Sequence, residues 1–136
     1  MYGHVKPDKG QIIINSDLAT INSPTTAQSL GINMVFQHFS LFESLTVAEN
    51  LILGMSEKIS LNKLKSKSET ICNKYGFNLN LNSPISALSV GQRQSVEIVR
   101  SLLNNPEILI MDEPTSVLTP EAVSYTHLTL PTNREV

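Results

Sequence analysis

A run of four apolar residues that ends in two acids constrains the fold of this chain more than any other feature. Ile108 to Met111 are all apolar, and Asp112 and Glu113 follow directly. Such a run is typical of a strand covered on both faces in a parallel sheet, and open α/β sheets bind ligands at the carboxyl ends of their strands. Two carboxylates there suit Mg²⁺, because one can hold the ion while the other orients a water. Taken alone, an acid pair more often serves only to cap a loop.

A polar turn at the start of a predicted helix precedes the acids by about twenty residues and reads LSVGQRQ, from Leu88 to Gln94. Ser89 can cap the helix, and Gly91 lets a ligand approach the backbone because it has no Cβ. Free N–H groups and the positive end of the helix dipole would face an anion there. Taken alone, an ordinary serine cap on an amphipathic helix is the better explanation.

The order and spacing of these motifs resemble those of the ATP-binding subunits of ABC transporters. That family carries LSGGQ before a helix, then a Walker B strand ending in Asp and Glu, then a D-loop; this chain has LSVGQ, ILIMDE and SVLT in that order. VGQRQ and PTSVLTPE further resemble the subgroup that serves nucleosides and simple sugars, whose ATPases are usually tandem two-domain chains. The resemblance implies an α/β fold, namely an ABC-type P-loop NTPase domain with an antiparallel β-subdomain and a helical subdomain.

The resemblance also assigns roles to particular residues. The signature turn is expected to contact the γ-phosphate of an ATP held by an opposing subunit. Its residues are Ser89, Val90, Gly91 and Gln92. Glu113 is expected to polarise the attacking water, while Asp112 and Gln37 are expected to hold Mg²⁺. Val90 replaces the usual first glycine of the signature, and Ser95 stands where many members have arginine, which removes a charge.

Parts of the family pattern do not occur in this sequence. There is no GxxxxGKS/T loop, so the lysine and hydroxyl that bind the phosphates and Mg²⁺ are missing. The upstream aromatic that stacks on adenine and the switch histidine are missing too. We therefore expect residues 1–121 to be a partial nucleotide-binding domain that lacks the Walker A segment and is inactive alone.

The last residues depart from the family pattern. VSYTHLTLPT, which begins at Val123, matches the in-frame translation of a transposase-type sequencing adapter. We therefore expect residues 122–136 to be a non-native tail and His127 to be neither the switch histidine nor a ligand. An unusual natural tail is the alternative.

Turn and capping signals place the elements before the signature. The predicted strands cover residues 11–15, a short stretch up to Ile21, and residues 32–36. Ser23 and Pro24 predict a helix start and Gly31 its end. A capping box of Thr46 and Glu49 opens a second helix. A third is predicted over residues 61–75, with a buried face made of Leu61, Leu64, Ile71 and Tyr75.

Gln37 ends a predicted strand within VFQHFSLFESLTVAENL and matches the family's Q-loop. The resemblance implies that the Gln37–Glu43 region contacts a transmembrane permease subunit. Three large apolar side chains in this loop, Phe39, Leu41 and Phe42, would be costly to leave in water. They either accept a coupling helix of that partner or belong to the core of the helical subdomain.

Composition limits the functional classes. The 136 residues are 40% hydrophobic and 16% charged, with a net charge of −2, which suits one ordinary soluble domain or a piece of one. The sequence has no basic run, so nucleic acid is not an expected partner. The single cysteine, Cys72, lies in a helical pattern and is expected to be a buried small apolar residue. No apolar run reaches the length of a membrane span.

The resemblance thus implies an ATPase subunit that uses ATP and Mg²⁺ to drive import of a small solute, a nucleoside or a simple sugar, at the cytoplasmic face of the cell membrane. The implied partners are a second nucleotide-binding domain, permease subunits and, indirectly, a solute-binding protein. Two alternatives stay open. A soluble ABC ATPase of translation or DNA repair would usually carry basic surface or long insertions. A non-hydrolytic regulatory half of a tandem ATPase would not need Glu113.

Overall fold

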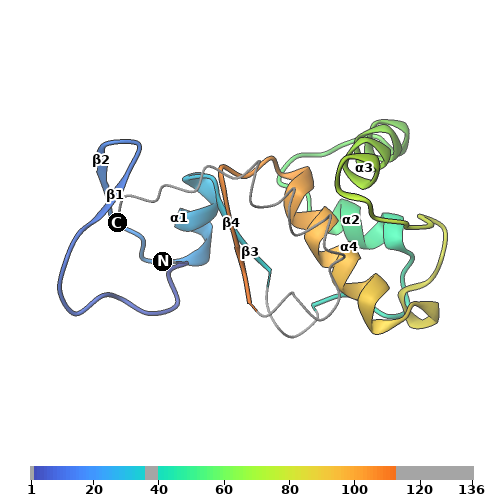
Figure 1. The fold of residues 1–136 in the computed structure, drawn as a ribbon, viewed down its shortest axis with the longest axis horizontal. Helices are drawn as coiled ribbons and strands as arrows, with labels where there is room; N and C mark the ends of the chain where they lie inside the picture. Colours follow the sequence, from blue (N-terminus) through green and yellow to red (C-terminus); the bar gives the residue numbers. More distant parts are fainter. Residues whose placement is uncertain (1, 36–39, 113–136) are drawn as a thin grey trace.

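The computed structural model describes residues 2–35 and 40–112 of the chain (Figure 1). In chain order the elements are β1 (Ile12–Ile14), β2 (Asp17–Ala19), α1 (Pro24–Ser29), β3 (Ile32–Val35), α2 (Val47–Leu53), α3 (Leu61–Tyr75), the 3-10 turn η1 (Ile85–Ala87), α4 (Val90–Leu103) and β4 (Ile108–Met111). Figure 1 shows β3 and β4 in the middle, with the hairpin and α1 on one side and the three longer helices on the other. None of the helices in these two ranges is long and apolar enough to cross a membrane.

The N-terminal hairpin confirms the predicted pair of strands, although both are shorter than expected. β1 pairs antiparallel with β2, and Ile14 lies opposite Asp17. The two turn residues, Asn15 and Ser16, have φ values of 51° and 70°. Positive φ at both central residues is the geometry of a type I′ turn, whose twist matches that of the flanking strands. The second strand ends at Ala19, two residues before its predicted end.

Helix α1 begins and ends as its sequence predicts. The Thr26 N–H donates to Ser23 Oγ at 3.2 Å, and Pro24 occupies the first turn, where its missing N–H is no loss. Gly31 follows the helix with φ +78°, a conformation that an L side chain rarely adopts. The chain turns there and continues directly into β3.

Strands β3 and β4 are parallel neighbours, and their residues alternate between two apolar layers. Ile32 pairs with Ile108 and Val35 with Met111. Ile32 packs with residues of α1 and the hairpin, whereas Val35 and Leu109 pack against Ile98 of α4. The predicted strand covered on both faces is therefore confirmed for β4.

A second core joins α2, α3 and α4. Its fully buried members are Val47, Leu51, Leu64, Ile85, Val96 and Val99. Leu64 and Tyr75 lie on the buried side of α3, as predicted, and Ile71 is partly buried. The prediction for Leu61 is wrong, because it is 59% exposed. It occupies the first position of α3 and lies beyond the contacts that this helix makes with the core.

Candidate functional site: the signature turn and the segment packed on its helix

Ser89 caps helix α4, as the sequence predicts. The Gln92 N–H donates to Ser89 Oγ at 3.2 Å, and the Ser89 N–H donates to Gln92 Oε1 at 3.0 Å. This reciprocal capping box satisfies two donors of the first turn. The N–H groups of Val90 and Gly91 have no acceptor within the helix, because they precede the first intrahelical bond. The turn can therefore be both a cap and an anion-binding helix start.

The remaining signature positions fit an accessible turn. Val90 is largely exposed, so the side chain that replaces the usual glycine projects into solvent. Ser95 Oγ donates to the Gly91 carbonyl at 3.0 Å, one helical turn away. The polar side chain at position 95 therefore makes its bond within α4.

Asp112 is exposed at the carboxyl end of β4, where the sequence places it. Its N–H donates to the Val35 carbonyl at 3.1 Å and so continues the ladder between β3 and β4. The other two residues expected to handle Mg²⁺ and water, Gln37 and Glu113, lie outside the described residues. Within the described ranges no group of three His, Cys, Asp or Glu side chains could hold a metal ion by itself.

The two candidate regions lie apart in the molecule. Figure 1 shows the N-terminal end of α4 as the end of that helix farther from β3 and β4. The signature turn precedes α4 and Asp112 follows β4, so the two stand at different places in the fold.

The apolar side chains of the Q-loop region do not all lie in the same environment. Leu41 packs against the helical core, whereas Phe42 is 58% exposed. Phe39 lies outside the described residues. Leu41 is thus a core residue, and Phe42 is available at the surface.

Asn50, a fully buried residue of α2, holds the backbone around Phe42. The Phe42 N–H donates to Asn50 Oδ1 at 2.8 Å, and Asn50 Nδ2 donates to the carbonyls of Phe42 and Thr46 at 3.1 and 2.9 Å. The sequence analysis missed this residue. The spacing of apolar residues could have predicted its burial. Asn50 lies three positions after Val47 and one before Leu51, and therefore on the apolar face of α2.

Glu97 of α4 is a second buried polar residue that the sequence analysis missed. Its carboxylate accepts hydrogen bonds from the N–H and Oγ of Ser40 at 2.8 and 3.2 Å and pairs with Arg100. Its neighbours in the chain, Val96 and Ile98, are both buried, but Glu97 lies on a helix face with Arg93 and Arg100, so the sequence pattern carried no clear signal for its burial.

Two pKa shifts have plain physical causes. The Thr46 N–H and hydroxyl bond to the Glu49 carboxylate and lower its pKa. Burial, with a smaller effect from the neighbouring Glu69 carboxylate, raises the pKa of the Cys72 thiol. Cys72 is only partly buried. A raised thiol pKa opposes nucleophilic reactivity and fits the expected packing role.

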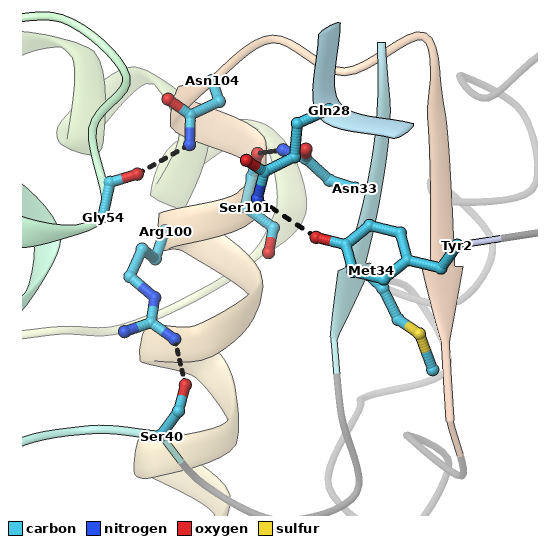
Figure 2. A pocket seen from close by; sticks show the side chains of 9 residues that line it. All are labelled: Tyr2, Gln28, Asn33, Met34, Ser40, Gly54, Arg100, Ser101 and Asn104. Carbon is cyan, nitrogen blue, oxygen red and sulfur yellow. Dashed lines mark hydrogen bonds between the residues drawn. The ribbon is translucent and has the colours of Figure 1, made fainter. Parts of the chain in front are cut away.

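A pocket of about 240 Å³ lies beside β3, between α1 and α4 (Figure 2). Its polar walls are mutually bonded. Gln28 Nε2 donates to the Tyr2 hydroxyl at 3.1 Å, and Asn33 Nδ2 donates to the Ser101 carbonyl at 3.0 Å. No residue expected to bind nucleotide or metal lines this pocket among the described ones. This pocket and the residues expected to bind nucleotide or metal therefore lie at different places among the described residues.

Comparison with known proteins identifies the class. The family described as ABC transporter matches residues 1–116, and the chain belongs to that family. It has the α/β fold of ABC ATPase cassettes. A nucleotide-free ATP-binding cassette from an ABC transporter superimposes with a TM-score of 0.68 at 26% identity, over 94% of this chain and 57% of that one. A dimeric cassette bound to ADP and Pi gives 0.66 at 27% identity, over 93% and 58%.

Particular relatives belong to importers. The chain is 39% identical over 127 residues to the guanosine import ATP-binding protein NupO of Bacillus subtilis, and 40% identical over 126 residues to the nucleoside import ATP-binding protein NupA of Lactococcus lactis. It is 41% identical over 122 residues to the ribose import ATP-binding protein RbsA of Caldanaerobacter subterraneus. These alignments cover 86 to 90% of this chain and 25% of each relative. The chain therefore spans about a quarter of the relatives' length.

Proposed function

We propose that this chain is part of the ATP-binding subunit of an ABC importer, in which ATP hydrolysis drives uptake of a nucleoside or a simple sugar. The observation that carries the proposal is the capped, accessible signature turn at the start of α4 in a cassette fold. The relatives named for guanosine, nucleoside and ribose import support the solute class. They also favour transport over a role in translation or DNA repair.

In this proposal the signature turn binds the γ-phosphate of ATP held by a second nucleotide-binding domain. The free N–H groups of its first turn and the helix dipole attract the phosphate. Val90 is exposed and Gly91 has no side chain, so the opposing domain can approach the backbone. Because the ATP is held by one domain and its γ-phosphate is bound by the signature turn of the other, this contact draws the two domains together.

The exposed Asp112 carboxylate fits a Mg²⁺ site of the kind that uses one or two protein ligands together with substrate phosphates. Asp112 and Gln37 would hold the ion, which would neutralise charge on the phosphates when bound. Glu113 would orient and polarise the attacking water. The sequence has no GxxxxGKS/T motif and therefore lacks the lysine of the phosphate-binding loop. Because this loop stabilises the charge on the phosphates, we expect the 136-residue chain alone not to hydrolyse ATP.

The remaining parts of the proposal concern assembly. The partners are a second cassette, as a dimer or a tandem half, and permease subunits that contact the Gln37–Glu43 region. A solute-binding protein acts indirectly through the permease. The exposed side chain of Phe42 supports the permease contact. The subunit is then a peripheral protein at the cytoplasmic face of the cell membrane.

Sequencing the source locus outward from the codons for Gly31 and Asp112 tests the proposal first. We expect a GxxxxGKS/T loop upstream and, in place of VSYTHL, a strand followed by a histidine downstream. The protein encoded by the extended frame should then hydrolyse ATP in the presence of Mg²⁺, and its Glu113→Gln variant should not. An extended protein without Mg²⁺-dependent ATPase activity would contradict the proposal.

A further inference from the structure

The loop segment of residues 40–43 is attached to one face of helix α4. Three side chains of α4 make the contacts, and they are Arg93, Glu97 and Arg100. They are spaced by four and three positions, so they lie along the same face of the helix. Arg93 Nη1 lies 2.8 Å from Glu43 Oε1, while Glu97 and Arg100 both contact Ser40. The helix therefore contacts both ends of the segment.

The contacts at Ser40 form a closed ring of three residues. Glu97 Oε1 accepts the Ser40 N–H at 2.8 Å and the Ser40 hydroxyl at 3.2 Å. Glu97 Oε2 pairs with Arg100, whose Nη2 also donates to Ser40 Oγ at 2.6 Å (Figure 2). Both carboxylate oxygens of Glu97 are thus used. The ring joins residues about 60 positions apart in the sequence.

Burial decides which of the two attachments is the stronger. Glu43 is 66% exposed, and an ion pair that open to water is screened and contributes little. Glu97 is 5% exposed, and its bond to a backbone N–H is charge-assisted and shielded from solvent. Glu97 is therefore the main connection between α4 and the segment.

The two ends of this connection have different neighbours. Helix α4 begins at the signature turn, and the 40–43 segment presents the exposed Phe42, whose backbone Asn50 fixes from the other side. A displacement of the segment would be transmitted to α4 through the ring at Glu97. Loss of the ring would leave the segment held only by the exposed Arg93–Glu43 pair and by the bond from the Ser86 N–H to the Glu43 carbonyl at 3.2 Å, just before the signature turn.

We propose that Glu97 is a positioning residue that ties residue 40 to the signature helix, so that the surface segment carrying Phe42 and the signature turn keep a fixed relation. The consequence for ATP hydrolysis rests on the proposed function, whereas the attachment itself does not. Glu97 contacts neither nucleotide nor metal in this assignment. Its effect passes through the orientation of α4.

Amide hydrogen exchange, measured by NMR on the 136-residue chain, tests the attachment directly. We expect the Ser40 amide to exchange at least tenfold faster in Glu97→Ala than in the unmodified chain, because its buried acceptor is gone. Glu97→Gln keeps an acceptor oxygen but loses the pair with Arg100, so its Ser40 amide should exchange at an intermediate rate. Unchanged Ser40 exchange in a folded Glu97→Ala chain would overturn the proposal; if Glu97→Ala does not fold, unchanged exchange in Glu97→Gln would overturn it.

Glu49→Ala is the matched control. Glu49 accepts the Thr46 N–H at 2.8 Å, the same length as the bond between Glu97 and the Ser40 N–H. Its loss should accelerate exchange at Thr46 and leave Ser40 unchanged. Equal acceleration at Ser40 in both variants would mean that Glu97 only stabilises the fold, and the proposal would be wrong.

The functional readout uses the full-length protein encoded at the source locus. There Glu97→Ala should lower kcat for ATP hydrolysis about tenfold through misplacement of the signature turn, with KM for ATP within about twofold. Glu49→Ala should leave both constants within about twofold. Equal losses of kcat in the two variants would overturn the positioning role. An unmodified protein without ATPase activity would instead refute the proposed function, and Ser40 exchange would still decide the attachment.

Discussion

At the scale of single residues, two buried polar side chains fix a surface loop that has no regular structure of its own. Asn50 and Glu97 come from different helices, and each accepts a hydrogen bond from a loop backbone N–H at 2.8 Å. A buried amide or carboxylate is unfavourable unless its bonds are made, so each side chain favours one loop conformation over the alternatives. Their bonds largely offset the cost of burying them, so their net contribution to stability is small, but removing either side chain leaves its buried partners unsatisfied.

Removal of Asn50 should be strongly destabilising. Asn50→Ala leaves the N–H and the carbonyl of Phe42 without their partner and opens space in a fully buried position. We expect the free energy of unfolding to fall by about 2–4 kcal/mol, as measured by urea denaturation. Asn62→Ala, at an exposed position of α3, is the control and should change it by less than about 0.5 kcal/mol. Similar losses in the two variants would show that the Phe42 contacts are not needed for folding.

At the scale of elements, the apolar pattern of α3 predicts most of its buried face but not where along the helix that face begins. Leu64 and Leu61 are three positions apart on one helix, yet one is fully buried and the other is 59% exposed. The helix begins at Leu61, where the chain enters from a loop, and Leu64, at the fourth position, is the first residue of this face that is buried. One matched pair of substitutions can measure this difference.

The two leucines should respond very differently to the same truncation. Leu64→Ala should lower the free energy of unfolding by about 2–5 kcal/mol, because it removes buried methyl groups and leaves a cavity. Leu61→Ala should lower it by less than about 1 kcal/mol and can even raise helix propensity. Urea denaturation of both variants gives the comparison. A larger effect at Leu61 would mean that the start of α3 is covered in solution.

Local signals predicted the boundaries of elements better than they predicted contacts. The helix starts at Pro24, Val47 and Val90 follow from caps one residue earlier, because capping depends on neighbours within three positions. The bond between Glu97 and Ser40 could not be predicted in this way, since its partners lie 57 positions apart. The exposure of Leu61 likewise depends on tertiary packing and not on its neighbours in the chain.

In the candidate site, too, local signals predicted the position of a residue in its element but not its long-range neighbours. Ser89 and Asp112 could be placed from sequence, because one is a cap and the other ends a strand. Their separation in space is a property of the tertiary fold and appears only in the structure. The roles of Gln37 and Glu113 stay predictions, since both lie outside the described residues.

At the scale of the whole molecule, the signature turn has an observed capping role and a proposed phosphate-binding role, and a single substitution can separate them. Ser89 caps α4, and in the proposed assembly it also approaches a phosphate of the opposing domain. Alanine would damage both functions. Aspartate keeps the cap, because its carboxylate accepts the same N–H and suits the positive end of the helix dipole.

Ser89→Asp in the full-length protein should therefore fold normally and hydrolyse ATP about a hundredfold more slowly, because its charge repels the γ-phosphate. The melting temperature and the rate of Mg²⁺-dependent phosphate release are the two measurements. Ser86→Ala, at an exposed serine three positions upstream, is the control and should change neither. Hydrolysis at the unmodified rate in Ser89→Asp would leave Ser89 with its capping role alone.

The parallel pairing of β3 with β4 also has a consequence for the order of folding. All of α2, α3 and α4 lies between these strands in the chain, and contacts such as that between Asn33 and Ser101 join residues 68 positions apart. Closing so long a connection costs entropy before any strand pair forms, so contacts of this kind slow folding. On the ribosome β3 emerges long before β4, and the helical part can collapse around Leu64 and Val96 in the interval. Among the described strands, β3 can therefore pair with β4 only after α4 has been synthesised. Until then the apolar residues of β3 need protection.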